Sequence, residues 1–153
     1  MKIQTLRYAV PGWGVGALGL AGRLVAHHDA PRPAPDAPDQ AHPLVDRIRS
    51  YFAGEREDFA DVELFPYDLT AFQHDVLETL RGVPYGEVVT YGELAALTGH
   101  PGAQRAVGTF CARNEFGLFV PCHRVVAASG IGAYGSLGVE YKRRLLELEG
   151  VRV

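Results

Sequence analysis

Cysteine is scarce in this sequence, which has two, Cys111 and Cys122, among 153 residues. Two cysteines are too few for a disulfide framework or for a zinc site built on cysteine pairs, and the histidines outside residues 121–124 show no metal-ligand spacing. We therefore expect a reducing, cytoplasmic location, no metal and no cofactor. Reduced thiols leave cysteine-based chemistry open.

Long uninterrupted hydrophobic runs are also missing. The most apolar stretch, residues 8–26, contains Pro11, Arg23 and five glycines, so it cannot cross a bilayer as a helix. Lys2 and Arg7 precede this stretch as they would in a secretory signal, but glycine at such density is more typical of β-hairpins. We therefore favour hairpins over a signal peptide and expect no membrane segment.

Neither positive nor negative charge dominates the chain. The formal net charge is −3, with 47% hydrophobic and 22% charged residues, which is typical of a globular protein. The charges are segregated, because residues 1–28 carry three basic and no acidic side chains, residues 29–100 five basic and fourteen acidic, and residues 101–153 seven basic and four acidic. The overall balance therefore says little about partners, and the length allows one ordinary domain or two small ones.

The first part of the chain predicts a small antiparallel sheet, because glycine and proline turn signals separate three short segments of strand-forming residues. These segments are residues 3–9, 14–20 and 23–28. A proline-rich acidic stretch at 29–43 predicts an extended surface loop, and apolar residues at helical spacing predict a helix over 44–52. We group these elements as an N-terminal α/β domain, residues 1–66.

Residues 67–153 predict a mainly helical second domain, so the expected fold class is α+β. Capping boxes begin helices at Thr70 and Thr90, and apolar periodicity predicts a further helix over 101–114 with a proline in its first turn. The short glycine-containing turn before this third helix predicts a helix-turn-helix. A last helix is expected over 139–149. Its expected inward residues are Tyr141, Leu145 and Leu148.

The helix over 101–114 has two unusual faces, one apolar and the other made of small residues apart from one arginine. The apolar stripe is Ala103, Val107, Phe110, Cys111 and Asn114, and the opposite face is Arg105, Gly108, Thr109 and Ala112. A solvated helix face normally carries long charged side chains, so we expect something to approach this face closely. Either the helix lies against a nucleic-acid groove with Arg105 projecting into it, or the face packs against another helix.

Cys122 is the candidate nucleophile. It stands between Pro121 and the pair His123 and Arg124, a setting that favours the thiolate if the site is partly exposed, although a lone cysteine in an apolar run is commonly structural. In an extended segment His123 points to the opposite face, so a water would connect it to the sulfur. Glu149 is the candidate carboxylate to orient the imidazole, if the last helix packs behind this segment.

Four ordered motifs resemble those of the O6-alkylguanine-DNA alkyltransferases. The motifs are Tyr85 to Ala95 (YGEVVTYGELA), Gln104 to Gly108 (QRAVG), Pro121 to Val126 (PCHRVV) and Leu145 to Gly150 (LLELEG). The resemblance covers about residues 69–150 in family order. It implies a ribonuclease H-like N-terminal domain and DNA repair by a single irreversible transfer of the alkyl group of O6-alkylguanine to Cys122.

The resemblance also implies roles for the residues around Cys122. His123 would be the base that acts through a water, Glu149 would orient His123, and Asn114 would stabilise the segment that joins the recognition helix to the site. Tyr91 would hydrogen-bond or protonate the guanine as it leaves. The residues that would line the base pocket are Tyr91, Val125, Tyr134 and Gly135.

The implied partner is duplex DNA that contains O6-alkylguanine, bound by a monomer in the minor groove. The target base would rotate out of the duplex, and Arg105 would fill the space that it leaves. The local positive charge would meet the phosphates. The residues implied in DNA contact are Thr90, Gln104, Arg105, Ala106, Gly108, Thr109 and Arg113.

Two positions depart from the family pattern, and three other functions compete with the one that the resemblance implies. Glu115 and Gly117 stand where prolines are usual, which bears on pocket rigidity and on the size of alkyl group accepted. The alternatives are a lesion-binding protein that recruits repair factors, a helix-turn-helix regulator that uses Cys122 as a sensor, and a cysteine hydrolase. The Cys122 thiol disfavours the lesion-binding protein, and the short chain disfavours the regulator. The adjacency of Cys122 and His123 disfavours the cysteine hydrolase.

Overall fold

The computed structural model describes residues 2–36 and 39–153, which form two compact units. The first unit comprises the described residues up to Pro66 together with Glu115–Phe119, and the second comprises Tyr67–Asn114 and Val120–Val153. Both helices and strands contribute, so the predicted α+β class is confirmed. The ribonuclease H-like and helix-turn-helix assignments stay predictions.

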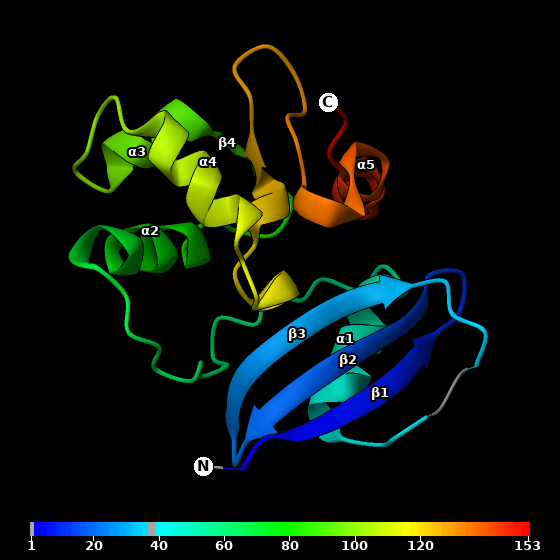
Figure 1. Cartoon of the computed structure of the whole chain (residues 1–153). Coiled ribbons are helices and arrows are strands. Elements are labelled where there is room, and N and C mark those ends of the chain that lie inside the picture. The colour runs from blue at the N-terminus through cyan, green and yellow to red at the C-terminus, as the bar shows by residue number, and fades with distance from the viewer. Residues whose placement is uncertain (1, 37–38) are drawn as a thin grey trace. The chain divides into compact units, whose positions relative to one another are not determined.

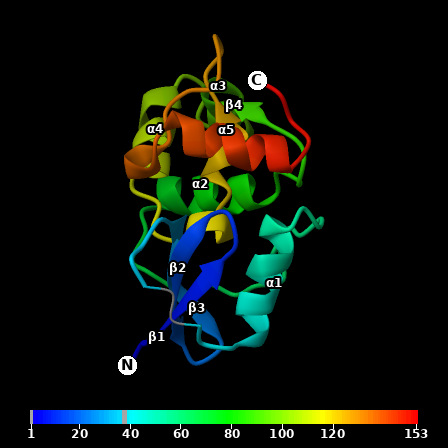
Figure 2. The same cartoon turned by 90° about the vertical axis from the view of Figure 1, so that its right-hand side faces the viewer.

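The first unit is built on a three-stranded antiparallel sheet in the order β1-β2-β3 (Figure 1). The strands are β1 (Gln4–Val10), β2 (Gly14–Ala21) and β3 (Leu24–Arg32). Gly12 and Gly22 lie in the connecting turns with φ of 81° and 61°, a conformation that favours glycine. Helix α1 (Pro43–Phe52) lies along one face of the sheet (Figures 1 and 2). The three predicted strands and the first helix are therefore confirmed.

The prediction of a loop over 29–43 is wrong at its start. Strand β3 continues to Arg32, with Asp29 opposite Ala17 and Arg32 opposite Val15. Because β3 is an edge strand of the sheet, Pro31 can occupy it without removing a hydrogen bond to β2. Residues 37–38 of the predicted loop lie outside the described residues.

The segment Glu115–Phe119 packs against β3 in the first unit. The backbone N–H of His28 donates to the carbonyl oxygen of Glu115 at 2.9 Å. Gly117 begins a short 3-10 helix with a φ of 54°, and a Cβ at this position would lie 2.2 Å from Nδ1 of His28. A proline, whose φ is fixed near about −65°, cannot adopt this conformation, which explains the departure from the family pattern at Gly117.

The second unit combines four helices with a short parallel strand pair. The helices are α2 (Ala71–Arg81), α3 (Tyr91–Leu97), α4 (Gln104–Ala112) and α5 (Val139–Leu148), and the strands are β4 (Val89–Thr90) and β5 (Val125–Val126). Complete capping boxes at Thr70 and Thr90 begin α2 and α3, which confirms both predicted starts. Helices α3 and α4 pack against each other and against α2 (Figure 1).

Two expectations for these helices are wrong. Helix α4 begins at Gln104 instead of 101, because Gly102 has a φ of 88° and the chain turns there before the helix starts. The buried side chains of α5 are Lys142, Leu145 and Leu146, whereas Tyr141 and Leu148 are only half-buried. Within the described part of the chain, no helix is long and apolar enough to cross a membrane.

Candidate active site

Cys122 begins a single 3-10 turn, η2 (Cys122–Arg124), directly before β5. The expected extended conformation of this segment is wrong, because the N–H of Arg124 donates back to the carbonyl of Pro121 at 3.0 Å. Three residues per turn send three successive side chains in three directions, which lets Cys122, His123 and Arg124 all be buried, at 3%, 1% and 3% exposure. Each of them therefore meets a different part of the interior.

Glu149 is the shared hydrogen-bond partner of His123 and Arg124. Sequence analysis predicted only its pairing with His123. Nε2 of His123 donates to Oε2 of Glu149 at 2.6 Å. Nε and Nη2 of Arg124 donate to the two carboxylate oxygens at 2.9 Å and 3.2 Å. The backbone N–H of Gly86 adds a bond to Oε1 at 3.0 Å. Glu149 follows the last residue of α5, so this helix carries the carboxylate to the 3-10 turn.

These contacts fix the charge of Glu149. Burial alone raises the pKa of a carboxyl group, but the hydrogen bonds from His123 and Arg124, together with the positive charge of Arg124, outweigh burial and hold the pKa of Glu149 far below its usual value. Arg124 is anchored further by a bond from Nη1 to the carbonyl of Val83 at 2.9 Å, and its guanidinium lies over the Tyr85 ring. No motif in the sequence indicated that Arg124 would bind Glu149.

The bond to Glu149 sets the tautomer of His123. A carboxylate only accepts hydrogen bonds, so the Nε2 atom of His123 carries a hydrogen. Burial lowers the pKa of His123, and this outweighs the opposite effect of Glu149, which leaves a neutral imidazole. In that tautomer Nδ1 holds the lone pair, and His123 can accept a proton there.

The thiol of Cys122 contacts the side chains of Cys111 and Asn114. Burial raises the pKa of this thiol well above its ordinary value, and the contact with Cys111 adds to the increase, whereas Lys142 and Asn114 act weakly in the opposite direction. A thiolate was expected only if the site is partly exposed, and because Cys122 is buried, desolvation favours the thiol. Nδ2 of Asn114 also donates to the carbonyl of Val120 at 2.9 Å.

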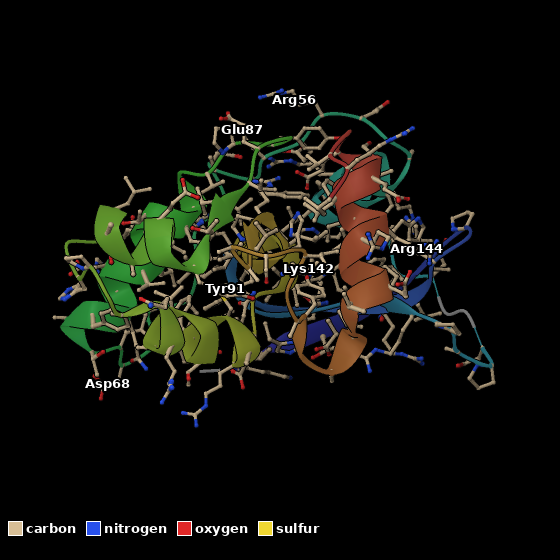
Figure 3. The ribbon with its side chains drawn as sticks, turned by 90° about the horizontal axis from the view of Figure 1, so that it is seen from above. Arg56, Asp68, Glu87, Tyr91, Lys142 and Arg144 are labelled. Atoms are coloured by element: carbon tan, nitrogen blue, oxygen red, sulfur yellow. The ribbon has the colours of Figure 1, made fainter. Side chains whose placement is uncertain are left out.

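Lys142 is a buried cation beside the site that sequence analysis missed. Its Nζ donates to the carbonyls of Val125 at 2.6 Å and Ala133 at 3.0 Å, and lies 5.6 Å from the centre of the Tyr91 ring. Figure 3 shows Lys142 and Tyr91 close together, whereas Arg144 projects from the opposite side of α5. Burial lowers the pKa of Lys142 to about 8. Lys142 precedes the apolar Leu145 by three residues, which places both on the same face of the helix, and this spacing could have indicated its burial.

The predicted pocket residues lie on several segments of the second unit. The Tyr91 hydroxyl donates to the carbonyl of Ala133 at 3.5 Å, and the Tyr134 ring lies edge-on to His123 at 6.5 Å. Burial raises the pKa of Tyr134, and the nearby Cys122 adds to this effect. Val125 is buried in β5, and Gly135 is exposed with a φ of 47°.

The two predicted faces of α4 are seen in the burial pattern. Val107 is fully buried, and the other predicted inward residues are half-buried. Arg105, Thr109 and Ala112 of the predicted opposite face are exposed, and so are three further residues implied in DNA contact, Gln104, Ala106 and Arg113. Gly108 is half-buried, with the Tyr91 ring 4.0 Å from where its Cβ would be. Thr90 uses its hydroxyl to cap α3.

Residues 2–36 and 39–153 contain no cluster of three or more histidine, cysteine, aspartate or glutamate side chains that could hold a metal ion. The side chains around the turn that carries Cys122 instead include a neutral imidazole, a carboxylate, two cations and two phenols. This arrangement suits proton transfer from the thiol, followed by nucleophilic attack of the sulfur.

Comparisons with known proteins identify related sequences. Residues 71–151 match the family described as "6-O-methylguanine DNA methyltransferase, DNA binding domain". The methylated-DNA–protein-cysteine methyltransferase of Mycobacterium bovis is 50% identical over 111 residues, which cover 71% of this chain and 64% of that protein. A protein of the same name from Methanosarcina acetivorans is 48% identical over 105 residues, which cover 68% and 65%. The chain thus spans just under two thirds of the length of these curated relatives.

Solved structures extend the similarity over nearly the whole chain. The crystal structure of Mycobacterium tuberculosis OGT in complex with DNA matches with a TM-score of 0.78 and 36% identity, over 95% of this chain and 92% of that one. O6-methylguanine-DNA methyltransferase from the hyperthermophilic archaeon Pyrococcus kodakaraensis matches with a TM-score of 0.73 and 28% identity, over 98% and 100%. Because the family match covers more than half of the sequence, the chain belongs to the 6-O-methylguanine DNA methyltransferase family.

Proposed function

We propose that this protein repairs DNA by irreversible transfer of an alkyl group, such as methyl, from O6-alkylguanine in duplex DNA to its own Cys122. The observation that carries the proposal is the buried hydrogen bond between His123 and Glu149, which fixes the imidazole in the same 3-10 turn as Cys122 and leaves Nδ1 as its proton-accepting nitrogen. Sulfur is a soft nucleophile suited to an alkyl carbon, and a thioether has no good leaving group for later hydrolysis. The family to which the chain belongs supports the same chemistry.

The nucleophile is made during the reaction, because burial keeps Cys122 protonated at rest. The thiol proton passes through a bridging water to Nδ1 of His123, and Glu149 stabilises the imidazolium that forms. The sulfur bonds to the alkyl carbon as the carbon–O6 bond breaks, and its electron pair goes to the guanine. Tyr91 hydrogen-bonds or protonates the leaving base. Asn114, bonded to the carbonyl of Val120, keeps the segment before Cys122 in place.

Base entry requires motion next to the sulfur, since Cys122 is 3% exposed. We assign the base pocket to Tyr91, Val125, Tyr134 and Gly135. The exposed residues of the glycine-rich loop lie at 128–130, 133 and 135–136. Displacement of this loop would break the hydrogen bonds of the Ala133 carbonyl with Lys142 and Tyr91, and it is the proposed route for a flipped base.

Duplex DNA is the proposed partner, bound through the outer face of α4 as part of a helix-turn-helix. Small side chains there let the backbone approach a minor groove, and Arg105 replaces the flipped base in the stack. The remaining proposed contacts are Thr90, Gln104, Ala106, Gly108, Thr109 and Arg113. A single-use acceptor needs no second subunit, so we propose a monomer, acting in the cytoplasm, with the DNA-binding domain at 67–153.

The decisive experiment is intact mass measurement after incubation with a duplex that carries one O6-methylguanine. We expect a gain equal to a methyl group replacing one hydrogen, located by peptide mapping on Cys122 and not on Cys111. The gain should vanish in Cys122→Ala, and a duplex with unmodified guanine is the control. Unchanged mass with tight lesion binding would instead identify a lesion-binding protein, and no preference for the lesion would indicate a regulator.

A further inference from the structure

Cys111 is a second sulfur beside Cys122 that the proposed reaction does not use. It lies in the last turn of α4 and is half-buried, whereas Cys122 is buried. Cys111 is the side chain that interacts most strongly with the Cys122 thiol. Tyr91, Tyr134 and Lys142 each interact electrostatically with both cysteines, so the two sulfurs share one cluster.

The backbone holds the two cysteines in this position. The N–H of Asn114 donates to the carbonyl of Cys111 at 3.2 Å, and the Asn114 side chain donates to the carbonyl of Val120 at 2.9 Å. The N–H of Cys122 donates to the same Val120 carbonyl at 2.7 Å. A short hydrogen-bonded path therefore joins the end of α4 to the 3-10 turn, and the contact between the sulfurs is part of the packed structure.

We propose that Cys111 and Cys122 form a reversible disulfide when the protein meets a hydroperoxide. The disulfide keeps the acceptor sulfur in a form that a thiol can reduce. Without a partner, further oxidation of Cys122 would irreversibly remove its ability to accept an alkyl group. Formation of the disulfide does not depend on the proposed function. Its consequence, reversible loss of alkyl transfer, rests on that function.

The chemistry balances with peroxide as the oxidant. The Cys111 thiol, which is the more exposed, attacks a peroxide oxygen and becomes a sulfenic acid while the peroxide leaves as water or an alcohol. The Cys122 thiol then attacks the Cys111 sulfur and expels water. The two thiols together lose two hydrogens and two electrons, which reduce the peroxide. A dithiol reverses the step by exchange through a mixed disulfide.

The geometry needs only a local change. A disulfide requires sulfurs about 2 Å apart and Cβ atoms about 3.8 Å apart, closer than two hydrogen-bonded thiols. Cys111 lies in the terminal turn of α4, where a helix opens at lower cost than in its middle. Closing the bond therefore requires this terminal turn to move towards Cys122.

The test treats the whole reduced protein with hydrogen peroxide in the absence of DNA. We expect an intact mass lower by two hydrogens, a peptide that joins Cys111 to Cys122, and full return to the starting mass with dithiothreitol. Cys111→Ser should instead gain oxygen on Cys122 that dithiothreitol does not fully remove. Cys111→Ala serves as a second variant, and circular dichroism checks that each variant is folded.

Oxygen addition to wild-type Cys122 at the rate seen in Cys111→Ser, with no cross-linked peptide, would overturn the proposal. Disulfide-linked dimers on a non-reducing gel in place of the internal bond would also overturn it. In a transfer assay, each oxidised protein is compared with its own reduced form, and only the wild type should recover fully with dithiothreitol. If the reduced wild type transfers no alkyl group, the proposed function fails while the disulfide result stands.

Discussion

His123 and Glu149 lie 26 residues apart in the sequence and share a buried 2.6 Å hydrogen bond. The same carboxylate accepts two bonds from Arg124 and one from the backbone of Gly86. With four donors around it, Glu149 has almost no freedom to rotate, and it holds the imidazole in one tautomer. The end of α5 and the 3-10 turn at Cys122 are therefore one hydrogen-bonded assembly.

Glu149→Gln tests this assembly. The glutamine amide carries N–H groups on one side, where His123 and Arg124 also donate, so at least one hydrogen bond to residue 149 is lost. The buried Arg124 guanidinium also loses its negative partner. We expect the single-turnover rate of alkyl transfer to fall about 100-fold or more, the usual contribution of acid–base catalysis. The free energy of unfolding should fall by about 3 kcal/mol in urea titrations.

Glu147→Gln is the matched control, because Glu147 is exposed on the same helix. Its rate and stability should stay close to wild type. If Glu149→Gln transfers methyl groups as fast as Glu147→Gln, Glu149 does not orient the base.

His28 gives the first unit a predicted pH dependence. It shares a buried 2.5 Å hydrogen bond with the Tyr8 hydroxyl, and burial, aided by the charge of His27, lowers its pKa from 6.5 to about 3. The unfolded chain therefore takes up a proton near pH 6.5 and the folded chain does not. Stability is fully present above pH 6.5 and falls as the pH drops towards 3, by at most about 1.4 kcal/mol per pH unit from this group.

Urea unfolding between pH 7 and pH 4 measures this effect as the difference between wild type and His28→Gln. Glutamine can keep a bond to Tyr8 but does not titrate, so the variant should lose less stability on acidification. His74→Gln, at an exposed position on α2, should follow the wild-type slope. Equal slopes for wild type and His28→Gln would show that His28 is protonated in the folded protein.

The sequence predicted local structure well where one signal acts alone. Capping boxes located α2 and α3, and glycine turns located the strands. The extended conformation expected around Cys122 was wrong because an apolar run does not distinguish a strand from a buried 3-10 turn. Lys142 was missed because burial of a lysine depends on carbonyls of Val125 and Ala133, which only the folded chain brings together.

In the candidate site, too, local signals were predictable from the sequence and tertiary effects were not. The pairing of His123 with Glu149 was predictable from the order of the motifs. The protonated state of Cys122 was not, because neighbours in sequence suggested positive charge whereas the fold supplies desolvation and the Cys111 thiol. Local pattern thus indicated the candidate reacting groups, whereas their protonation depends on tertiary packing.

Gly117→Ala should destabilise the protein although it adds only one methyl group. Gly117 combines a φ of 54° with a Cβ position 2.2 Å from His28 Nδ1, so alanine is strained in its backbone and clashes with a buried ring. We expect a loss of about 2 kcal/mol or more in the free energy of unfolding. Gly130→Ala, where a Cβ meets nothing within 4 Å, should change it by less than about 0.5 kcal/mol. Similar small effects at both positions would contradict this reading of Gly117.

Arg105→Ala separates DNA recognition from alkyl transfer. Arg105 is exposed on α4 and makes no proposed contact with the sulfur, so its loss should leave reaction with the free base O6-methylguanine unchanged. Transfer from duplex DNA should fall about tenfold or more, as expected for one lost groove contact. Competing single-turnover assays on the two substrates give the ratio directly. Arg56→Ala, an exposed arginine of the first unit, should leave both rates at wild-type values. Equal losses on duplex and free base would mean that Arg105 supports the fold of α4 and does not take the place of the flipped base.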